Sequence, residues 1–317
     1  MSTSIPKIVL PGGSGFLGGI IAPAFVSAGW DVVILARHPE RITPRARVIA
    51  WDGRTIGPWA AELEGATAIL NLAGRSVNCR YNATNRRTIM DSRIDSTRIL
   101  GRAIAACSCP PRVWLNSSTA TIYRHSLDQP MDESTGQIGS TLEVNDAFSI
   151  EVATAWEREL VAADTPRTRK LALRTAMVFG RGGGGVFSVL CRLVRLGLGG
   201  RMASGRQYVS WIHEHDFCRA IQWLIDHPDV SGPVNLAAPH PVSNADMMRI
   251  FRRQCRMPIG LPAARWMLEV GTFLMRTESE LVIKSRRVVP GRLLASGFQF
   301  RFPDLESTLA DLLRPAT

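Results

Sequence analysis

Residues 11–18 read Pro11-Gly12-Gly13-Ser14-Gly15-Phe16-Leu17-Gly18, between an apolar run at 7–10 and a helical pattern at 16–28. They satisfy the spacing GxGxxG from Gly13 and the spacing GxxGxxG from Gly12. Glycine suits such a turn because the backbone must approach a pyrophosphate, whose charge then rests on the N–H groups of the following helix. In this strand–turn–helix context the motif predicts a dinucleotide site in preference to a plain glycine turn.

Outward from this turn, strand-like and helix-like segments alternate along the chain. The apolar runs that predict strands occupy residues 31–35, 48–50, 68–72, 113–116, 170–178 and 234–236. Long helical patterns separate several of them, at 84–106 and 147–163. This alternation predicts right-handed βαβ units on a doubly wound parallel sheet, which is an α/β Rossmann architecture.

The 317 residues are enough for about two domains. After four glycines at 182–185 the pattern changes to a helix at 186–198 and an apolar, Met-rich helix at 263–275. We therefore assign residues 1–183, with a return segment near 212–241, to a nucleotide-binding Rossmann domain. Residues 184–211 and 242–317 are assigned to a smaller C-terminal α/β lobe for the substrate.

The formal net charge is +11, from 38 basic and 27 acidic residues, and a charge of this size can indicate a nucleic-acid partner. The basic residues are scattered, however, with arginines interspersed among apolar positions. We therefore expect a basic surface and no nucleic-acid binding. No membrane partner is expected either, because no run of 18 apolar residues occurs. The expected partner is a small-molecule substrate, and both monomer and homodimer stay open.

Cysteine usage argues against metal binding and against export. The six cysteines form no CxxC pair, and the CxC at Cys107 and Cys109 lacks a second pair of ligands at useful spacing. No metal site is therefore expected. The first 25 residues do not carry a basic segment, an apolar stretch and a cleavage site in series. Reduced thiols without an export signal predict a cytoplasmic protein.

The end of the second predicted strand bears on the choice of nicotinamide cofactor. An acidic residue there would bind the ribose hydroxyls of NAD, but the chain reads Leu35-Ala36-Arg37-His38. The Arg37 guanidinium suits a 2′-phosphate, so we expect NADP(H). Asn71-Leu72-Ala73-Gly74 ends another strand with small residues that let the backbone pass close to a ribose. Hydroxyl-rich residues 116–123 follow the next strand, as a ligand site or as a turn.

Seven longer blocks carry a more specific pattern. They are GGSGFLG at 12–18, NLAG at 71–74, DSRIDSTRIL at 91–100, WE at 156–157, LRTAMVFGRGGG at 173–184, LGLGGRMASGRQYVSWIHEHD at 196–216 and RRVVPGRLLASGFQFRFPDL at 286–305. Together they cover nearly the whole chain. The sequence resembles the atypical epimerase family, a branch of the extended short-chain dehydrogenase/reductase superfamily that includes nucleotide-sugar epimerases and dehydratases. The resemblance implies a Rossmann fold that binds NADP(H) across its strand ends.

The resemblance also implies roles for individual positions. Arg93 stands where extended members usually carry asparagine and would contact the cofactor, a helix-surface ion pair being the alternative. Thr119 matches the catalytic serine or threonine that would hydrogen-bond a substrate oxygen. The residues that would contact the cofactor are Gly12, Ser14, Gly15, Phe16, Leu17, Arg37, Leu72, Ala73, Gly74, Arg93 and Val178.

The chain departs from the superfamily at the catalytic Tyr–Lys pair. None of its three tyrosines is followed by lysine four residues later, so no YxxxK exists. Alignment on Trp156-Glu157 places Ser149 and Ala153, or their neighbours Phe148 and Val152, in the two slots. Tyr123 is the nearest candidate to supply a proton, with packing under the loop as its alternative role.

We therefore expect an NADP(H)-binding, epimerase-like protein. It would act as an oxidoreductase or epimerase by hydride transfer on a small carbonyl or sugar-like substrate, with Thr119 and Tyr123 as candidate catalytic residues. A non-catalytic NADP(H) sensor or scaffold is the alternative, because the cofactor site is provided for and the Tyr–Lys pair is not. Substrate identity has no readable code in the sequence.

Overall fold

The computed structural model describes residues 5–41, 46–182, 184–274, 278 and 280–314. Its centre is a seven-stranded sheet in the order β10-β6-β5-β4-β1-β2-β3, and every neighbouring pair is parallel. The strands are β1 (Lys7–Pro11), β2 (Asp31–Ala36), β3 (Arg47–Ala50), β4 (Ala68–Asn71), β5 (Val113–Thr119), β6 (Arg169–Thr175) and β10 (Gly232–Leu236). The predicted α/β Rossmann architecture is confirmed.

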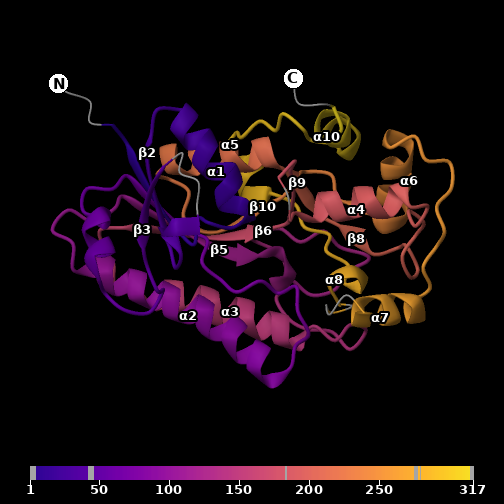
Figure 1. Ribbon diagram of the computed structural model, residues 1–317, viewed down its shortest axis with the longest axis horizontal. Coiled ribbons are helices and arrows are strands. Elements are labelled where there is room, and N and C mark those ends of the chain that lie inside the picture. Colours follow the sequence, from indigo (N-terminus) through magenta and orange to yellow (C-terminus); the bar gives the residue numbers. More distant parts are fainter. Residues whose placement is uncertain (1–4, 42–45, 183, 275–277, 279, 315–317) are drawn as a thin grey trace.

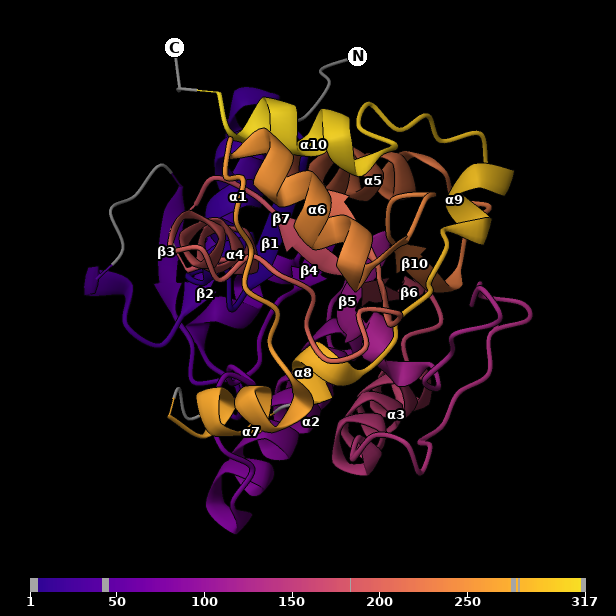
Figure 2. The same ribbon diagram turned by 90° about the vertical axis from the view of Figure 1, so that its right-hand side faces the viewer.

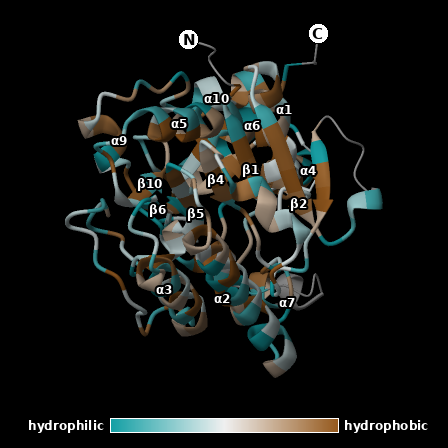
Figure 3. Ribbon diagram, turned by 90° about the vertical axis from the view of Figure 1, so that its left-hand side faces the viewer, coloured by the Kyte–Doolittle hydropathy of each residue, from teal (hydrophilic) through white to brown (hydrophobic). Residues whose placement is uncertain are grey.

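Helices cover both faces of this sheet (Figure 1). On one face α1 (Phe16–Ser27) and α5 (Glu214–Asp226) share a hydrophobic cluster with Ile8 and Leu10 of β1. On the other face α2 (Ala83–Ala105) and α3 (Ala147–Ala162) pack in a cluster with Val9. Successive side chains of a strand point to opposite faces, so an apolar run such as 8–10 serves both layers. Figure 3 shows this as strongly hydrophobic strands β1 and β2.

The C-terminal part adds a second core beside the sheet. Helices α4 (Val186–Arg195), α6 (Asn244–Gln254) and α10 (Leu305–Leu312) share one cluster of buried side chains and lie near one another in Figure 2. Shorter elements complete the chain: η1 (Pro39–Arg41), η2 (Pro58–Leu63), η3 (Ala120–Ile122), β7 (Met177–Phe179), β8 (Tyr208–Val209), β9 (Trp211–His213), β11 (Val242–Ser243), α7 (Arg265–Leu274), α8 (Glu280–Ile283) and α9 (Gly291–Ala295).

The prediction of one strand over residues 170–178 is wrong. The chain changes partner at Ala176, whose N–H donates to the Leu236 carbonyl, whereas the Met177 N–H donates to the Ser210 carbonyl. Residues 177–179 therefore leave the main sheet and pair with β9. The helix expected at 263–275 forms as α7, and residue 275 lies outside the described residues. Within the described part of the chain, no helix is long and apolar enough to cross a bilayer.

Candidate functional site

The turn between β1 and α1 needs glycine for two separate reasons. Gly12 has a φ of +74°, and a Cβ on it would lie 2.6 Å from the Ala73 Cα and 2.7 Å from the Ala73 nitrogen. Gly18 is also closed to a side chain, because its Cβ would overlap the Gly13 carbonyl. Gly15 differs, since its Cβ would meet nothing closer than the Gly12 oxygen at 4.0 Å. Packing therefore requires glycine at 12 and 18, whereas the space beside Gly15 is left for a ligand.

Gly15 is also the N-cap residue of α1, and among the described residues no side chain caps this helix. The first N–H groups of a helix have no intrahelical acceptor and carry the positive end of the helix dipole. An anion beside Gly15 would satisfy these groups. The turn after β1 therefore has both the space and the donors that a pyrophosphate needs.

A cleft of about 520 Å³ runs from this turn along the carboxyl ends of β1, β4 and β5. The predicted residues that it brings together are Gly12, Gly15, Phe16, Leu17, Leu72, Gly74, Arg93 and Thr119. They come from four separate segments of the chain. This edge is where open parallel sheets bind their ligands, because the loops after successive strands converge there.

Arg93 of α2 lines the cleft. Its Nη1 donates to the carbonyls of Arg75 at 3.1 Å and Ile89 at 3.0 Å, and its guanidinium stacks 5.0 Å from the centre of the Trp156 ring. Burial lowers the pKa of Arg93 to about 10, which keeps the group charged at neutral pH. No carboxylate within the described ranges forms an ion pair with it. The Arg93 side chain is thus a fixed cation beside Gly74, where an added Cβ would lie 3.2 Å from the Arg93 Cζ.

Thr119 ends β5 with its side chain at the cleft. Its Oγ1 accepts a hydrogen bond from the Thr121 backbone N–H at 3.1 Å and so caps the short helix η3. A hydroxyl that accepts one bond can still donate its own proton. The turn role and the ligand role that the sequence left open for this hydroxyl are therefore compatible.

Five predicted residues do not line the cleft. Ala73 lies behind Gly12, and Val178 is buried in the core of the sheet. Ser14 faces the other side of α1, and Arg37 is exposed just beyond β2. Tyr123 is only 1% exposed and is absent from the cleft wall.

The position of Tyr123 corrects the expectation that it supplies a proton. Its hydroxyl accepts from Arg174 Nη1 at 2.8 Å and donates to Asn235 Oδ1 at 3.0 Å. Arg174 in turn holds Glu157 through two hydrogen bonds of 2.9 and 2.8 Å. Burial raises the pKa of the Tyr123 hydroxyl. Tyr123 therefore belongs to a buried network that ties β6, β10 and α3 together, as its alternative packing role implies.

The cleft also contains polar residues that were not predicted as site residues. Tyr81 and Thr121 line it, and so does Ser149, which occupies one slot of the missing Tyr–Lys pair. Arg286 reaches the same place from the C-terminal part, where its Nε donates to Thr121 Oγ1 at 3.1 Å. Two of them had a signal in the sequence: Ser149 through its spacing from Trp156-Glu157, and Thr121 through its place in the hydroxyl-rich segment 116–123. The approach of Arg286 depends on a contact between residues 165 positions apart.

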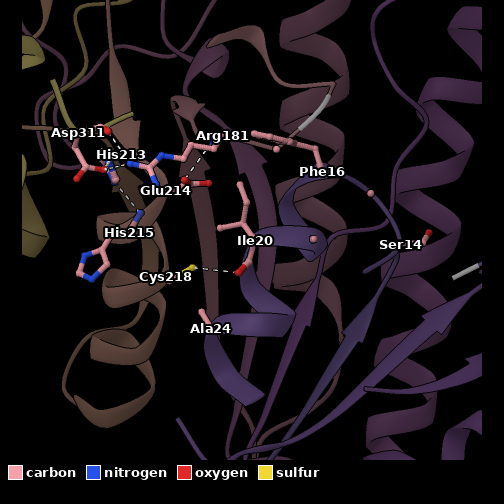
Figure 4. A pocket seen from close by; sticks show the side chains of 13 residues that line it. Ser14, Phe16, Ile20, Ala24, Arg181, His213, Glu214, His215, Cys218 and Asp311 are labelled. Atoms are coloured by element: carbon pink, nitrogen blue, oxygen red, sulfur yellow. Dashed lines mark hydrogen bonds and ion pairs between the residues drawn. The ribbon is translucent and has the colours of Figure 1, made fainter. Parts of the chain in front are cut away.

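A second pocket, of about 680 Å³, lies on the other side of α1 (Figure 4). Its polar groups largely satisfy one another. His213 Nε2 lies 3.2 Å from Asp311 Oδ2, and His213 Nδ1 accepts from the His215 backbone N–H at 2.9 Å. Arg181 Nη2 donates to the Asp311 carbonyl at 2.6 Å. Burial lowers the pKa of His213 to about 4, so this ring is neutral and caps α5.

Comparison with known families agrees with this geometry. Residues 8–237 match the NAD dependent epimerase/dehydratase family, and residues 263–312 match a domain of unknown function, DUF1731. The first match covers all seven strands of the Rossmann sheet except Lys7, the first residue of β1. The second covers α7, α8, α9 and α10.

Individual relatives resemble the chain over nearly its full length. Epimerase family protein SDR39U1 of Bos taurus is 31% identical, covering 97% of this chain and 99% of the relative. Epimerase family protein YfhF of Bacillus subtilis is 28% identical, covering 97% and 98%. The crystal structure of human epimerase family protein SDR39U1 (isoform2) with NADPH superposes with a TM-score of 0.84 at 27% identity, covering 96% of this chain and 98% of that one. This chain therefore belongs to the NAD dependent epimerase/dehydratase family, within the extended short-chain dehydrogenases/reductases.

Proposed function

We propose that this protein binds NADP(H) and transfers a hydride between the nicotinamide and a small carbonyl or sugar-like substrate, as an oxidoreductase or epimerase. The observation that carries the proposal is the single cleft that joins Gly15 at the start of α1 to the Thr119 hydroxyl at the end of β5. One end has the donors for a pyrophosphate. The other end has a hydroxyl that can hydrogen-bond a substrate oxygen.

Several features support NADP(H) as the cofactor. The space beside Gly15 and the uncapped start of α1 fit a pyrophosphate. The exposed guanidinium of Arg37 follows β2, where a 2′-phosphate would be bound in a Rossmann fold. The human relative was crystallised with NADPH. When bound, the nicotinamide supplies or accepts the hydride.

The chain's own residues would bind and orient the reactants. Thr119 would fix the substrate oxygen by donating its O–H, and Arg93 would hold its charge beside Gly74. Phe16, Leu17 and Val152 are apolar parts of the cleft wall and would exclude water from the bound cofactor. Holding the two carbons in line is itself a large part of such catalysis.

The missing Tyr–Lys pair favours a second candidate, a non-catalytic NADP(H) sensor or scaffold. Stopped-flow absorbance of bound NADPH, across a panel of carbonyl compounds and UDP-sugars, separates the two candidates. We expect poor turnover of ordinary UDP-sugars and NADPH oxidation by at least one small carbonyl compound. Binding by calorimetry without oxidation by any compound would favour the sensor, and no binding would reject both.

A further inference from the structure

Ser149 stands at the boundary between the cofactor cleft and a smaller adjoining pocket. It is the third residue of α3, and its side chain lines the cleft together with Thr119, Tyr81 and Val152. Behind it, the Ser149 hydroxyl donates a hydrogen bond to Glu280 Oε1. Glu280 begins α8 and lines the adjoining pocket, whose volume is about 250 Å³.

We propose that Ser149 and Glu280 are the proton-transfer pair of this site, with Ser149 touching the substrate and Glu280 holding the proton behind it. This inference rests on the proposed function and deepens it, since it supplies the acid–base group that the absent Tyr–Lys pair leaves missing. General acid–base help of this kind contributes about 10²–10⁴-fold to a reaction rate.

The surroundings of Glu280 suit a proton carrier better than a structural ion pair. Its side chain is 5% exposed, and among the described residues its Oε2 has no hydrogen-bond partner. Buried carboxylates that serve structure are usually fully hydrogen-bonded, because an unsatisfied charged oxygen is costly. Within the described part of the chain, the Ser149 hydroxyl is the group that hydrogen-bonds this carboxyl. Ser149 thus connects the pair to the cleft, while Oε2 of Glu280 has no hydrogen-bond partner among the described residues.

Charged groups reach Glu280 from every element around it. Arg286 and Lys284 follow α8 and favour the carboxylate, whereas Asp146 precedes α3 and disfavours it. Lys284 is itself neutralised, because its Nζ lies 2.6 Å from Asp146 Oδ2 with both side chains fully buried. The other titratable or charged groups of the adjoining pocket are Tyr81, Arg86, Arg265 and Glu278.

Burial is the largest of these influences and raises the pKa of Glu280, while the Ser149 hydrogen bond lowers it. A carboxyl whose pKa moves toward neutrality can both take and return a proton. Tyr81 is the other hydroxyl nearby, and burial raises its pKa to about 12, but it is the Ser149 hydroxyl that donates to a carboxylate. Ser149 is therefore a hydroxyl of the cleft wall that has a proton acceptor, the Glu280 carboxylate, at hydrogen-bond distance.

In the direction of oxidation, the substrate C–H bond breaks and its electron pair moves as hydride to the nicotinamide of NADP⁺. The substrate hydroxyl gives its proton to Ser149 Oγ as the Ser149 proton passes to Glu280 Oε1. A hydroxyl compound, NADP⁺ and a carboxylate thus become a carbonyl compound, NADPH and a carboxylic acid. Reduction runs through the same groups in reverse.

This pair predicts that the protonation of Glu280 follows the redox state of the cofactor. The positive charge of oxidised nicotinamide should favour the carboxylate, so the pKa of Glu280 should be lower with NADP⁺ than with NADPH by about one unit, which is a tenfold change in proton affinity. The test is a ¹³C NMR titration of the full chain labelled at glutamate side-chain carboxyls, with Glu280→Gln to assign the signal. Glu278→Gln is the matched control, because Glu278 ion-pairs with Arg80 and should not report the redox state.

Ser149→Ala should raise the pKa of Glu280 by removing its hydrogen bond, and Ser149→Thr should restore it. An equal pKa in the NADP⁺ and NADPH complexes would overturn the relay, and so would a Glu280 titration that Ser149→Ala leaves unmoved. Calorimetry on the same samples keeps the two proposals apart. No heat with NADPH would reject the proposed function, and the Ser149→Ala titration of the unliganded chain would then decide the pairing by itself.

Discussion

Replacing Gly12 by alanine should destabilise the fold, whereas the same change at Gly15 should damage only cofactor binding. An alanine at position 12 must adopt a φ of +74°, which costs about 1–2 kcal/mol. Its Cβ would also lie 2.6 Å from the Ala73 Cα and 2.9 Å from the Leu72 carbonyl carbon, and separating two backbone segments in a packed region costs about 1–3 kcal/mol more. The sum is about 2–5 kcal/mol, a large part of a typical stability of about 5–15 kcal/mol.

The Gly15→Ala variant is the matched control. Gly15 has a φ of −86°, and its Cβ would have no neighbour closer than 4.0 Å. Its free energy of unfolding should stay within about 0.5 kcal/mol of wild type. The added methyl group occupies the space assigned to the pyrophosphate, so NADPH affinity should fall at least about tenfold, or 1.4 kcal/mol.

Urea unfolding followed by tryptophan fluorescence gives the first quantity, and isothermal titration calorimetry with NADPH gives the second. The reasoning fails if Gly12→Ala unfolds within about 0.5 kcal/mol of wild type. It also fails if Gly15→Ala binds NADPH as tightly as wild type, because the open space beside Gly15 would then have another purpose.

Three further predictions test separate parts of the site. Arg37→Ala should weaken NADPH binding by about 1.5–3 kcal/mol and leave NADH binding nearly unchanged, and equal calorimetric losses for both would remove Arg37 from the 2′-phosphate. Thr119→Ala should lower the rate of NADPH oxidation more than Tyr123→Phe does. Tyr123→Phe should be the less stable of the two variants in urea, by about 1–3 kcal/mol, because it breaks a buried hydrogen-bond network. The reverse order in either measurement would contradict the placement of Thr119 in the cleft and of Tyr123 in the buried network. Burial holds the pKa of His213 at about 4, against about 6.5 in the unfolded chain, so the free energy of unfolding should fall as the pH drops from 6.5 toward 4. A His213→Gln variant whose urea unfolding shows the same pH dependence as wild type would disprove this.

The fold could be predicted from the sequence because most of its strands are short apolar runs buried on both faces. The run expected at 31–35 forms β2 over Asp31–Ala36, and the run expected at 113–116 extends to Thr119 as β5. The break between β6 and β7 was missed because apolar residues continue through it. What separates the two strands is a change of partner at Ala176, and partners are set by the tertiary structure.

The candidate site was predictable where one local motif forms it. The glycine turn is such a motif, and Thr119 follows from its place at a strand end. Tyr123 was misplaced because four residues after Thr119 suggests proximity, whereas η3 turns the chain and carries its hydroxyl to Arg174 and Asn235. Glu280 could not be found at all, because it meets Ser149 across 131 residues of sequence.

A crystal structure of the chain grown with NADPH tests the central claim most directly, since the structure offers two pockets of similar size on either side of α1. We predict electron density for the pyrophosphate beside Gly15 and for the nicotinamide beside Thr119 and Ser149, in the cleft that contains Arg93. Density for the nicotinamide in the opposite pocket, against His213 and Asp311, would contradict the account.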